Sequence, residues 1–368
     1  MTSFDYIAAF YAEHHTPDGI VREIDSLLSA QPLNARAIPF GCELATLDWL
    51  DGRTSGERKA QILYKDGRLS CFQLNYSFKH QGRQKKKSGR FYTLQDEQYQ
   101  NVFVALTIEP TDFYHRALLP FLSSLYPKVM MTFITHKKLR RLLEQFQSKG
   151  NYSALVITRA SQRLRYEERE RGHHTIPVVS WPSITLGEAF DWVYEQNGWF
   201  ESISFDVRQR FLTLANITLT RKGIIRANAL FADAYKSFLK PVSKTIHDNL
   251  ELFSHRSRLE REDRSPRPLV IDFEAGQFRD VEENGRFIQA MRRLKTASVS
   301  VLHGNPYIQL SVIDYFDGSV FDVWVLDEHQ IVIVPQLKGS VAAIKRLINH
   351  VFDDYAEGQL SNYSADRV

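Results

Sequence analysis

Six basic residues lie within twelve positions, between two stretches whose residues alternate as those of strands do. The segment from Lys79 to Arg90 contains no acidic residue. Basic side chains neutralise phosphates and displace the counterions held there, and Arg can also bind a phosphate through two parallel hydrogen bonds. We interpret this segment as a mobile basic loop that contacts a polyanion through Lys79, Arg83, Lys85, Lys86, Lys87 and Arg90.

Two further groups of cations follow this segment. A helix predicted at 135–148 carries Lys137, Lys138, Arg140 and Arg141, and Arg159, Arg163 and Arg165 follow a predicted strand at 153–158. Residues 61–175 hold 20 Lys or Arg against 9 Asp or Glu, although the whole chain has a net charge of only +4. This asymmetry indicates a nucleic acid or an acidic protein surface as partner. A solubilising surface without a ligand is the alternative.

Carboxylates beside a lysine form a second candidate site. Asp51 precedes Glu57 and Lys59, just before a predicted strand at 60–64. Carboxylates can hold a divalent cation against a phosphate. The order resembles the D…E-x-K pattern of restriction-type nucleases, and the resemblance implies these three residues as catalytic, with Mg²⁺ or Mn²⁺. In that family E-x-K lies within a strand, whereas here it lies at the edge of one, so a solvated loop is the alternative.

Asp272 and Glu274 occupy alternate positions at the end of a strand predicted at 269–273, so both side chains are expected on one face. The D-x-E pair resembles the opening of exonuclease domains of the ribonuclease-H type, and the resemblance implies a catalytic role for both. Such domains need more acids over a longer stretch than the 94 residues that follow Glu274. The later acids are predicted at hairpin turns, where Asp is favoured.

Several function classes lack their sequence signatures. The chain has neither a G-x-G-x-x-G nor a Walker A motif, and its 12 His residues form no local chelating pattern. Cofactors are therefore not expected, apart from the metal of a nuclease. The two cysteines provide no disulfide framework, and we find neither an export signal nor an apolar run long enough to cross a bilayer. The sequence predicts a cytoplasmic protein without membrane contact.

The periodicity predicts an α+β fold with two or three domains, each an antiparallel β-meander covered by helices. The predicted boundaries are 1–150 with the basic loop 79–90, 151–260, 266–358 and a tail at 359–368. Strands followed by a helix recur near 60–126, 201–253 and 299–355 without a recognisable residue-level repeat. Asp66-Gly67 marks a hairpin turn between two of the strands.

These observations favour a non-enzymatic, nucleic-acid-associated protein that contacts the phosphate backbone through its basic middle segment. The first alternative is a metal-dependent nuclease belonging to a defence or mobile-element system. The second is a scaffold that forms homo-oligomers, in which acidic ends bind the basic middle of neighbouring copies. DNA and RNA are not distinguished at this point.

Overall fold

The computed structural model confirms the α+β class, with 34% helix, 39% strand and two antiparallel sheets. It describes residues 3–164, 178–196, 198–253, 256, 267–273, 276–305, 307–336 and 338–363. The chain divides into two compact units, which are described separately below. Unit 1 comprises residues 1–162 and 176–248, and unit 2 comprises residues 163–175 and 249–368. The domain boundary predicted near residue 150 thus falls inside unit 1.

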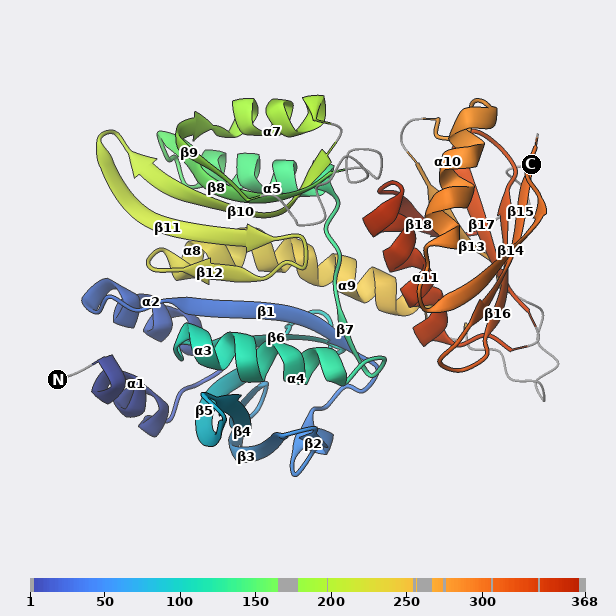
Figure 1. Ribbon diagram of the computed structural model, residues 1–368. Coiled ribbons are helices and arrows are strands. Elements are labelled where there is room, and N and C mark those ends of the chain that lie inside the picture. The colour runs from blue at the N-terminus through green and yellow to red at the C-terminus, as the bar shows by residue number, and fades with distance from the viewer. Residues whose placement is uncertain are drawn as a thin grey trace. The chain divides into compact units, whose positions relative to one another are not determined.

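Unit 1 is built on one 12-stranded sheet (Figure 1). The strands run in the order β2-β3-β4-β5-β6-β1-β12-β11-β10-β8-β9, and β7 pairs with β1 beside β12. Their bounds are β1 Ala35–Cys42, β2 Thr54–Ser55, β3 Arg58–Asp66, β4 Leu69–His80, β5 Arg83–Gln95, β6 Val102–Thr107, β7 Val129–Met131, β8 Ala154–Leu164, β9 Val178–Thr185, β10 Gly198–Gln209, β11 Leu212–Thr220 and β12 Ile225–Ala227. The predicted hairpin turn at Asp66-Gly67 is confirmed, because β3 and β4 pair on either side of it.

Two helices of unit 1 begin at threonine N-caps. Thr135 accepts a hydrogen bond from the Lys138 N–H at the start of α5, and Thr185 forms a capping box with Glu188 at the start of α7. The bounds are α1 Ser3–Ala12, α2 Ile20–Ala30, α3 Thr111–Phe113, α4 Leu119–Ser124, α5 His136–Lys149, α7 Leu186–Glu195, α8 Phe231–Ala234 and α9 Lys240–Phe253. The division between the units falls within α9.

The core around β1 and β3–β6 fixes where the basic segment leaves the sheet. Phe72 and Phe91 stand opposite each other on β4 and β5 with stacked rings 5.2 Å apart, and Phe113 at the end of α3 joins the same cluster. On the other face, Tyr11 of α1 stacks on Tyr92 at 5.2 Å. Burial of large aromatic groups on both faces makes this part of the sheet a stiff platform.

The two halves of unit 1 share an arrangement that includes a residue-level repeat, which sequence analysis missed. The strands β4-β5-β6 lead into α3, a π-helical turn at Tyr114–Leu118 and α4, and β10-β11-β12 lead into α8, a π-helical turn at Tyr235–Leu239 and α9. In both helices the sequence is D-x-Y-x-x-x-L-x-P. Each proline lies at the start of the α-helical part, after the wider turn, and for this reason Pro241 does not interrupt the helix.

The described part of unit 2 contains a six-stranded antiparallel sheet in the order β14-β15-β16-β17-β13-β18, together with helices α10 and α11. Its elements are β13 Leu269–Asp272, α10 Val281–Arg292, β14 Ala297–His303, β15 Ile308–Asp314, β16 Val320–Val325, β17 Gln330–Pro335, α11 Val341–Asp354 and β18 Gln359–Asn362. The prediction of a tail from 359 was wrong for β18, which pairs with β13. The short sequence Gln-Leu-Ser-Asn carries no strand signal of its own, and its ordering comes from hydrogen bonds to that neighbour.

We predict that Gly89→Ala destabilises unit 1. Gly89 is buried on β5, and a Cβ atom there would lie 2.3 Å from the Phe113 ring, so the helix or the strand must shift. The expected loss is about 1–3 kcal/mol of unfolding free energy, measured by denaturant unfolding. Gly187→Ala is the control, because that site in α7 has open space. Equal stability of the two variants would contradict the packing described here.

Candidate nucleic-acid interface

The basic segment is a β-hairpin, and the prediction of a loop at 79–90 was wrong. Strand β4 continues to His80 and β5 begins at Arg83, so that only Gln81 and Gly82 form the turn. Both turn residues have positive φ, of 50° and 75°, as the tight turns favoured in hairpins require. Sequence reasoning missed the outer part of both strands because residues 79–88 are polar on both faces and show no alternation.

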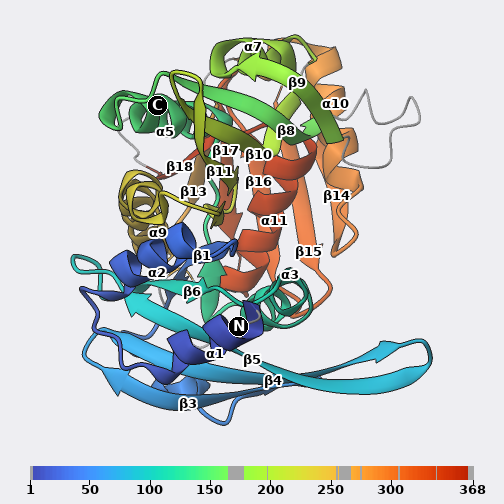
Figure 2. The ribbon, with the colours of Figure 1, turned by 90° about the vertical axis from the view of Figure 1, so that its left-hand side faces the viewer.

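The end of this hairpin leaves the sheet. Strand β3 pairs with β4 only as far as Tyr76, and β6 pairs with β5 only from Tyr92 onward. Residues 76–87, which we call the basic ribbon, are therefore a two-stranded extension held mainly by the pairing of β4 with β5. Figure 2 shows this hairpin reaching away from the body of unit 1.

The cations of the basic ribbon lie on both of its faces. Register places Lys87 opposite Tyr76 and Lys85 opposite Phe78, so these residues and Arg83 share the face of the aromatic core. Lys79 and Lys86 lie on the other face. Lys79, Arg83, Lys85 and Lys86 are exposed and form no ion pair with any residue that the structure describes. These four positive charges are available to a ligand.

Lys87 anchors the base of the basic ribbon. Its ammonium group lies 3.3 Å from an Asp112 carboxylate oxygen and 5.5 Å from the centre of the Phe78 ring. Arg116 pairs with the same carboxylate and lies 4.5 Å from the same ring. Burial opposes ionisation of Asp112, but the hydrogen bonds from Lys87 and Arg116 prevail and lower its pKa. Arg116, which sequence reasoning did not select, thus belongs to this site.

Arg90 lies inside the fold, unlike the other cations of the segment. Its guanidinium donates to the carbonyl of Tyr11 at 3.3 Å, and its backbone N–H donates to a Glu109 carboxylate oxygen at 3.0 Å. Burial raises the pKa of Glu109. The side chain is half-buried, so its role in this structure is to join β5 to α1 rather than to present charge.

The structure does not bring the cations of α5 to the basic ribbon. The sheet places β8 and β10 at the far end of unit 1 from β5, and α5 lies with them in Figure 1. Six strand spacings separate β5 from β8, or about 29 Å at 4.8 Å each. Lys138 bonds to Thr245, Arg140 pairs with Glu144 and Asp191, and Arg141 is exposed.

The remaining described cations of the middle segment lie on β8 and α5. Arg159 is exposed on β8, and Arg163 pairs with Asp353 at 3.6 Å. Lys137 is exposed on α5. Arg165 lies outside the described residues. Within residues 61–162, positive charge therefore occupies separate places rather than one surface.

The predicted nuclease residues near β3 each have a separate environment. Asp51 accepts a hydrogen bond from the Ile62 N–H at 2.8 Å, and Glu57 accepts one from the Ser77 hydroxyl at 2.7 Å. Lys59 is exposed opposite Asn75 on β4. Within the described part of the chain, no group of three or more His, Cys, Asp or Glu side chains is placed to hold a metal ion. These contacts suit turn and strand-edge structure.

Asp272 is held by neighbouring strands. One carboxylate oxygen accepts a hydrogen bond from Gln330 of β17 at 2.8 Å, and the other accepts one from Ser361 of β18 at 2.7 Å. Its partner in the D-x-E pair, Glu274, lies outside the described residues. The observed role of Asp272 is to bridge three strands of the unit 2 sheet.

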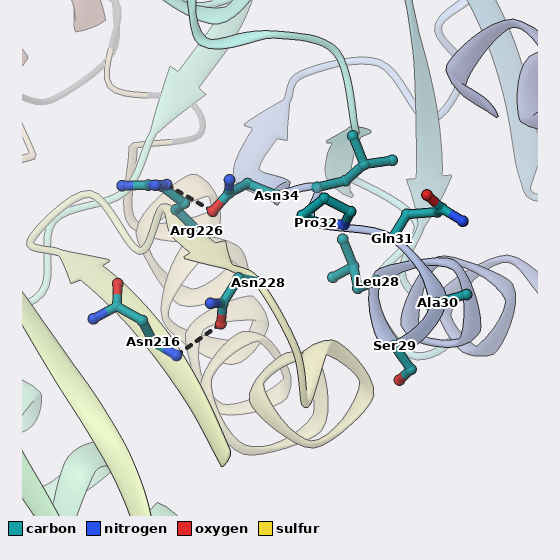
Figure 3. Close-up of a pocket in the computed structure, with 10 residues that line it drawn as sticks. Leu28, Ser29, Ala30, Gln31, Pro32, Asn34, Asn216, Arg226 and Asn228 are labelled. Carbon is teal, nitrogen blue, oxygen red and sulfur yellow. Dashed lines mark hydrogen bonds between the residues drawn. The ribbon is translucent and has the colours of Figure 1, made fainter. Parts of the chain in front are cut away.

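A polar hollow of about 460 Å³ lies between the end of α2 and strands β11 and β12 (Figure 3). Asn34 accepts a hydrogen bond from Arg226 at 3.1 Å, and Asn228 accepts one from the Asn216 N–H at 2.7 Å. Arg226 stands opposite Arg36 of β1. Burial, helped by Arg226, lowers the pKa of Arg36 to about 10. The hollow is a feature separate from the basic ribbon, and two pairs of its polar residues bond to each other.

Comparison with known proteins adds no family to this description. No family model matches the chain, and no curated protein matches it. Among the described helices, none combines the length and apolar composition that a membrane span requires.

We predict that the start of α5 makes unit 1 sensitive to acid. Burial, with Arg221 and Arg140 nearby, lowers the pKa of His136 to about 4, compared with about 6.5 in an unfolded chain. The unfolded state thus binds more protons between these values, and stability falls as pH falls from 6.5 toward 4, by up to about 3 kcal/mol. Denaturant unfolding of wild type and His136→Gln across this range measures the difference. An equal pH slope in both proteins would contradict it.

Proposed function

We propose that this chain is a nucleic-acid-binding protein that holds the phosphate backbone through the basic ribbon, without reading base sequence and without catalysing a reaction. The observation that carries the proposal is the set of four exposed, unpaired cations in the described structure of the ribbon: Lys79, Arg83, Lys85 and Lys86. Between Leu69 and Gln95 neither strand contains an acidic residue. Nothing within the hairpin therefore competes with phosphate for these charges.

The architecture of the basic ribbon supports this function. Paired strands hold the lysine backbones at fixed spacing, so that fewer residues lose freedom on binding than in a mobile loop. The base is held by Lys87, Arg116 and Asp112, which leaves the outer cations for the ligand. Each phosphate neutralised releases counterions, and this gain is independent of base sequence.

The chemistry of the cations also favours contacts to the backbone. Three of the four are lysines, which carry a point charge on a flexible stem and lack the planar fork by which Arg recognises guanine. The basic groups of α5 and β8 are not included in the proposal, because they lie far from the ribbon in the same sheet. The proposed interface accordingly contains fewer cations than the sequence alone indicated.

We predict salt-dependent binding that depends on the ribbon. Fluorescence anisotropy with a labelled 25-base-pair DNA should show affinity falling with log salt concentration, with a slope of about −4 for four phosphate contacts. Lys85→Glu with Lys86→Glu should weaken binding at least tenfold at about 100 mM salt, since two attractive contacts become repulsive. Arg141→Glu with Lys149→Glu changes the net charge equally, at exposed sites on α5, and should have a much smaller effect.

Two results would reject the proposed function. One is a folded wild-type protein that binds neither DNA nor RNA, single- or double-stranded, at 50 mM salt. The other is an equal loss of affinity in the ribbon variant and the α5 control, which would mean that net charge rather than the ribbon is responsible.

A further inference from the structure

The distribution of charge over the basic ribbon restricts how a polyanion can meet it. Arg83 and Lys85 project from one face, and Lys79 and Lys86 project from the opposite face, as the pairing register requires. A ligand lying flat against one face would leave the cations of the other face in solvent. Both pairs contact phosphates together only if negative charge lies on both sides of the ribbon.

A groove of a double helix provides this arrangement, because a phosphate backbone runs along each of its walls. We propose that the basic ribbon enters the major groove of B-form double-stranded DNA tip first, so that its two faces meet the two phosphate walls. This inference rests on the proposed function, and it names the ligand class of the same site.

The dimensions of the ribbon fit this groove. From Ser77 to the turn at Gln81 the strand covers four residues, or about 13 Å, which exceeds the major-groove depth of about 8.5 Å. A β-layer with its side chains is about 10 Å thick, and the major groove is about 12 Å wide. The minor groove, at about 6 Å, is too narrow for such a layer.

Other nucleic acids fit the ribbon less well. The major groove of A-form RNA is deep and narrow, and side chains cannot reach its floor. A single strand presents one backbone, and its bases need exposed aromatic rings on which to stack. On the ribbon, Tyr76 is buried, and Phe78 is already covered by Lys87 and Arg116. The ribbon thus presents no open Phe, Tyr or Trp ring in the described structure, and its exposed planar groups are His80 and Arg83 at the tip.

Contacts at the base of the ribbon support the insertion of its tip. An isolated two-stranded hairpin is only marginally stable in water. Here the Tyr76 and Phe78 rings lie 5.9 Å apart and Tyr76 contacts Phe113, while the pairing of Asp112 with Lys87 connects strand β5 to α3. These contacts support the ribbon where it leaves the sheet.

The test compares the two faces of the ribbon. Arg83→Ala with Lys85→Ala removes the charges of one face, and Lys79→Ala with Lys86→Ala removes those of the other. Arg141→Ala with Lys149→Ala is the control of equal charge on α5. Affinity for a 25-base-pair DNA duplex, an RNA duplex and a single-stranded DNA of the same length is measured between 50 and 300 mM salt. Circular dichroism and thermal melting establish that each variant is folded.

We expect each face variant to lose about tenfold in duplex DNA affinity at 100 mM salt, and the magnitude of its salt slope to fall by about 2. Wild type should bind duplex DNA more tightly than RNA duplex or single strand. If only one face variant loses affinity, or if single strands or RNA duplexes bind as well as duplex DNA, groove insertion is wrong while backbone binding stands. If no nucleic acid binds, the proposed function itself fails.

Discussion

The contact between Phe113 and Gly89 is the constraint on which the position of the basic ribbon depends. Only a residue without a Cβ atom lets the aromatic ring approach β5 so closely, and this approach places α3 against the last residues of the hairpin that the sheet supports. Asp112, the residue before Phe113, is thereby held between Lys87 and Arg116. A single carboxylate at the base thus balances the two nearest cations, and the charges farther out lie beyond its reach.

Sequence reasoning predicted those elements whose apolar residues follow one period. The helix capped by Thr135, the hairpin at Asp66-Gly67 and the last helix, α11, occur where expected. The predictions for the basic segment and for β18 were wrong for one physical reason. Both are strands that are ordered by hydrogen bonds to a neighbouring strand, so apolar and polar residues do not need to alternate along them. The sequence of an exposed two-stranded ribbon resembles that of a loop.

The basic residues of the candidate site could be selected from the sequence, but their arrangement could not. A count of charge along the chain places Lys85 and Arg141 in one segment, whereas the sheet order separates them by most of its width. The acidic candidates show the same limitation. Asp51 and Asp272 occur in suggestive patterns, yet hydrogen bonds to Ile62 and to Gln330 account for their positions. Pairing between strands that are distant in sequence decides where the cations lie and which groups bond to the carboxylates. This pairing leaves no local signal in the sequence.

The repeat within unit 1 gives the basic ribbon a counterpart in the second half. The hairpin of β10 and β11 precedes the second π-turned helix, as the ribbon hairpin precedes the first. Its turn is equally tight, with Arg210 at a φ of 55°, but its tip exposes Phe211 completely and Leu212 by 69%. The same arrangement of strands and helix therefore carries a cationic hairpin tip in the first half and, in the second half, a tip with two exposed apolar side chains beside Arg210. The side chains at a hairpin tip can therefore differ between the two halves while the arrangement of the supporting strands and helix stays the same.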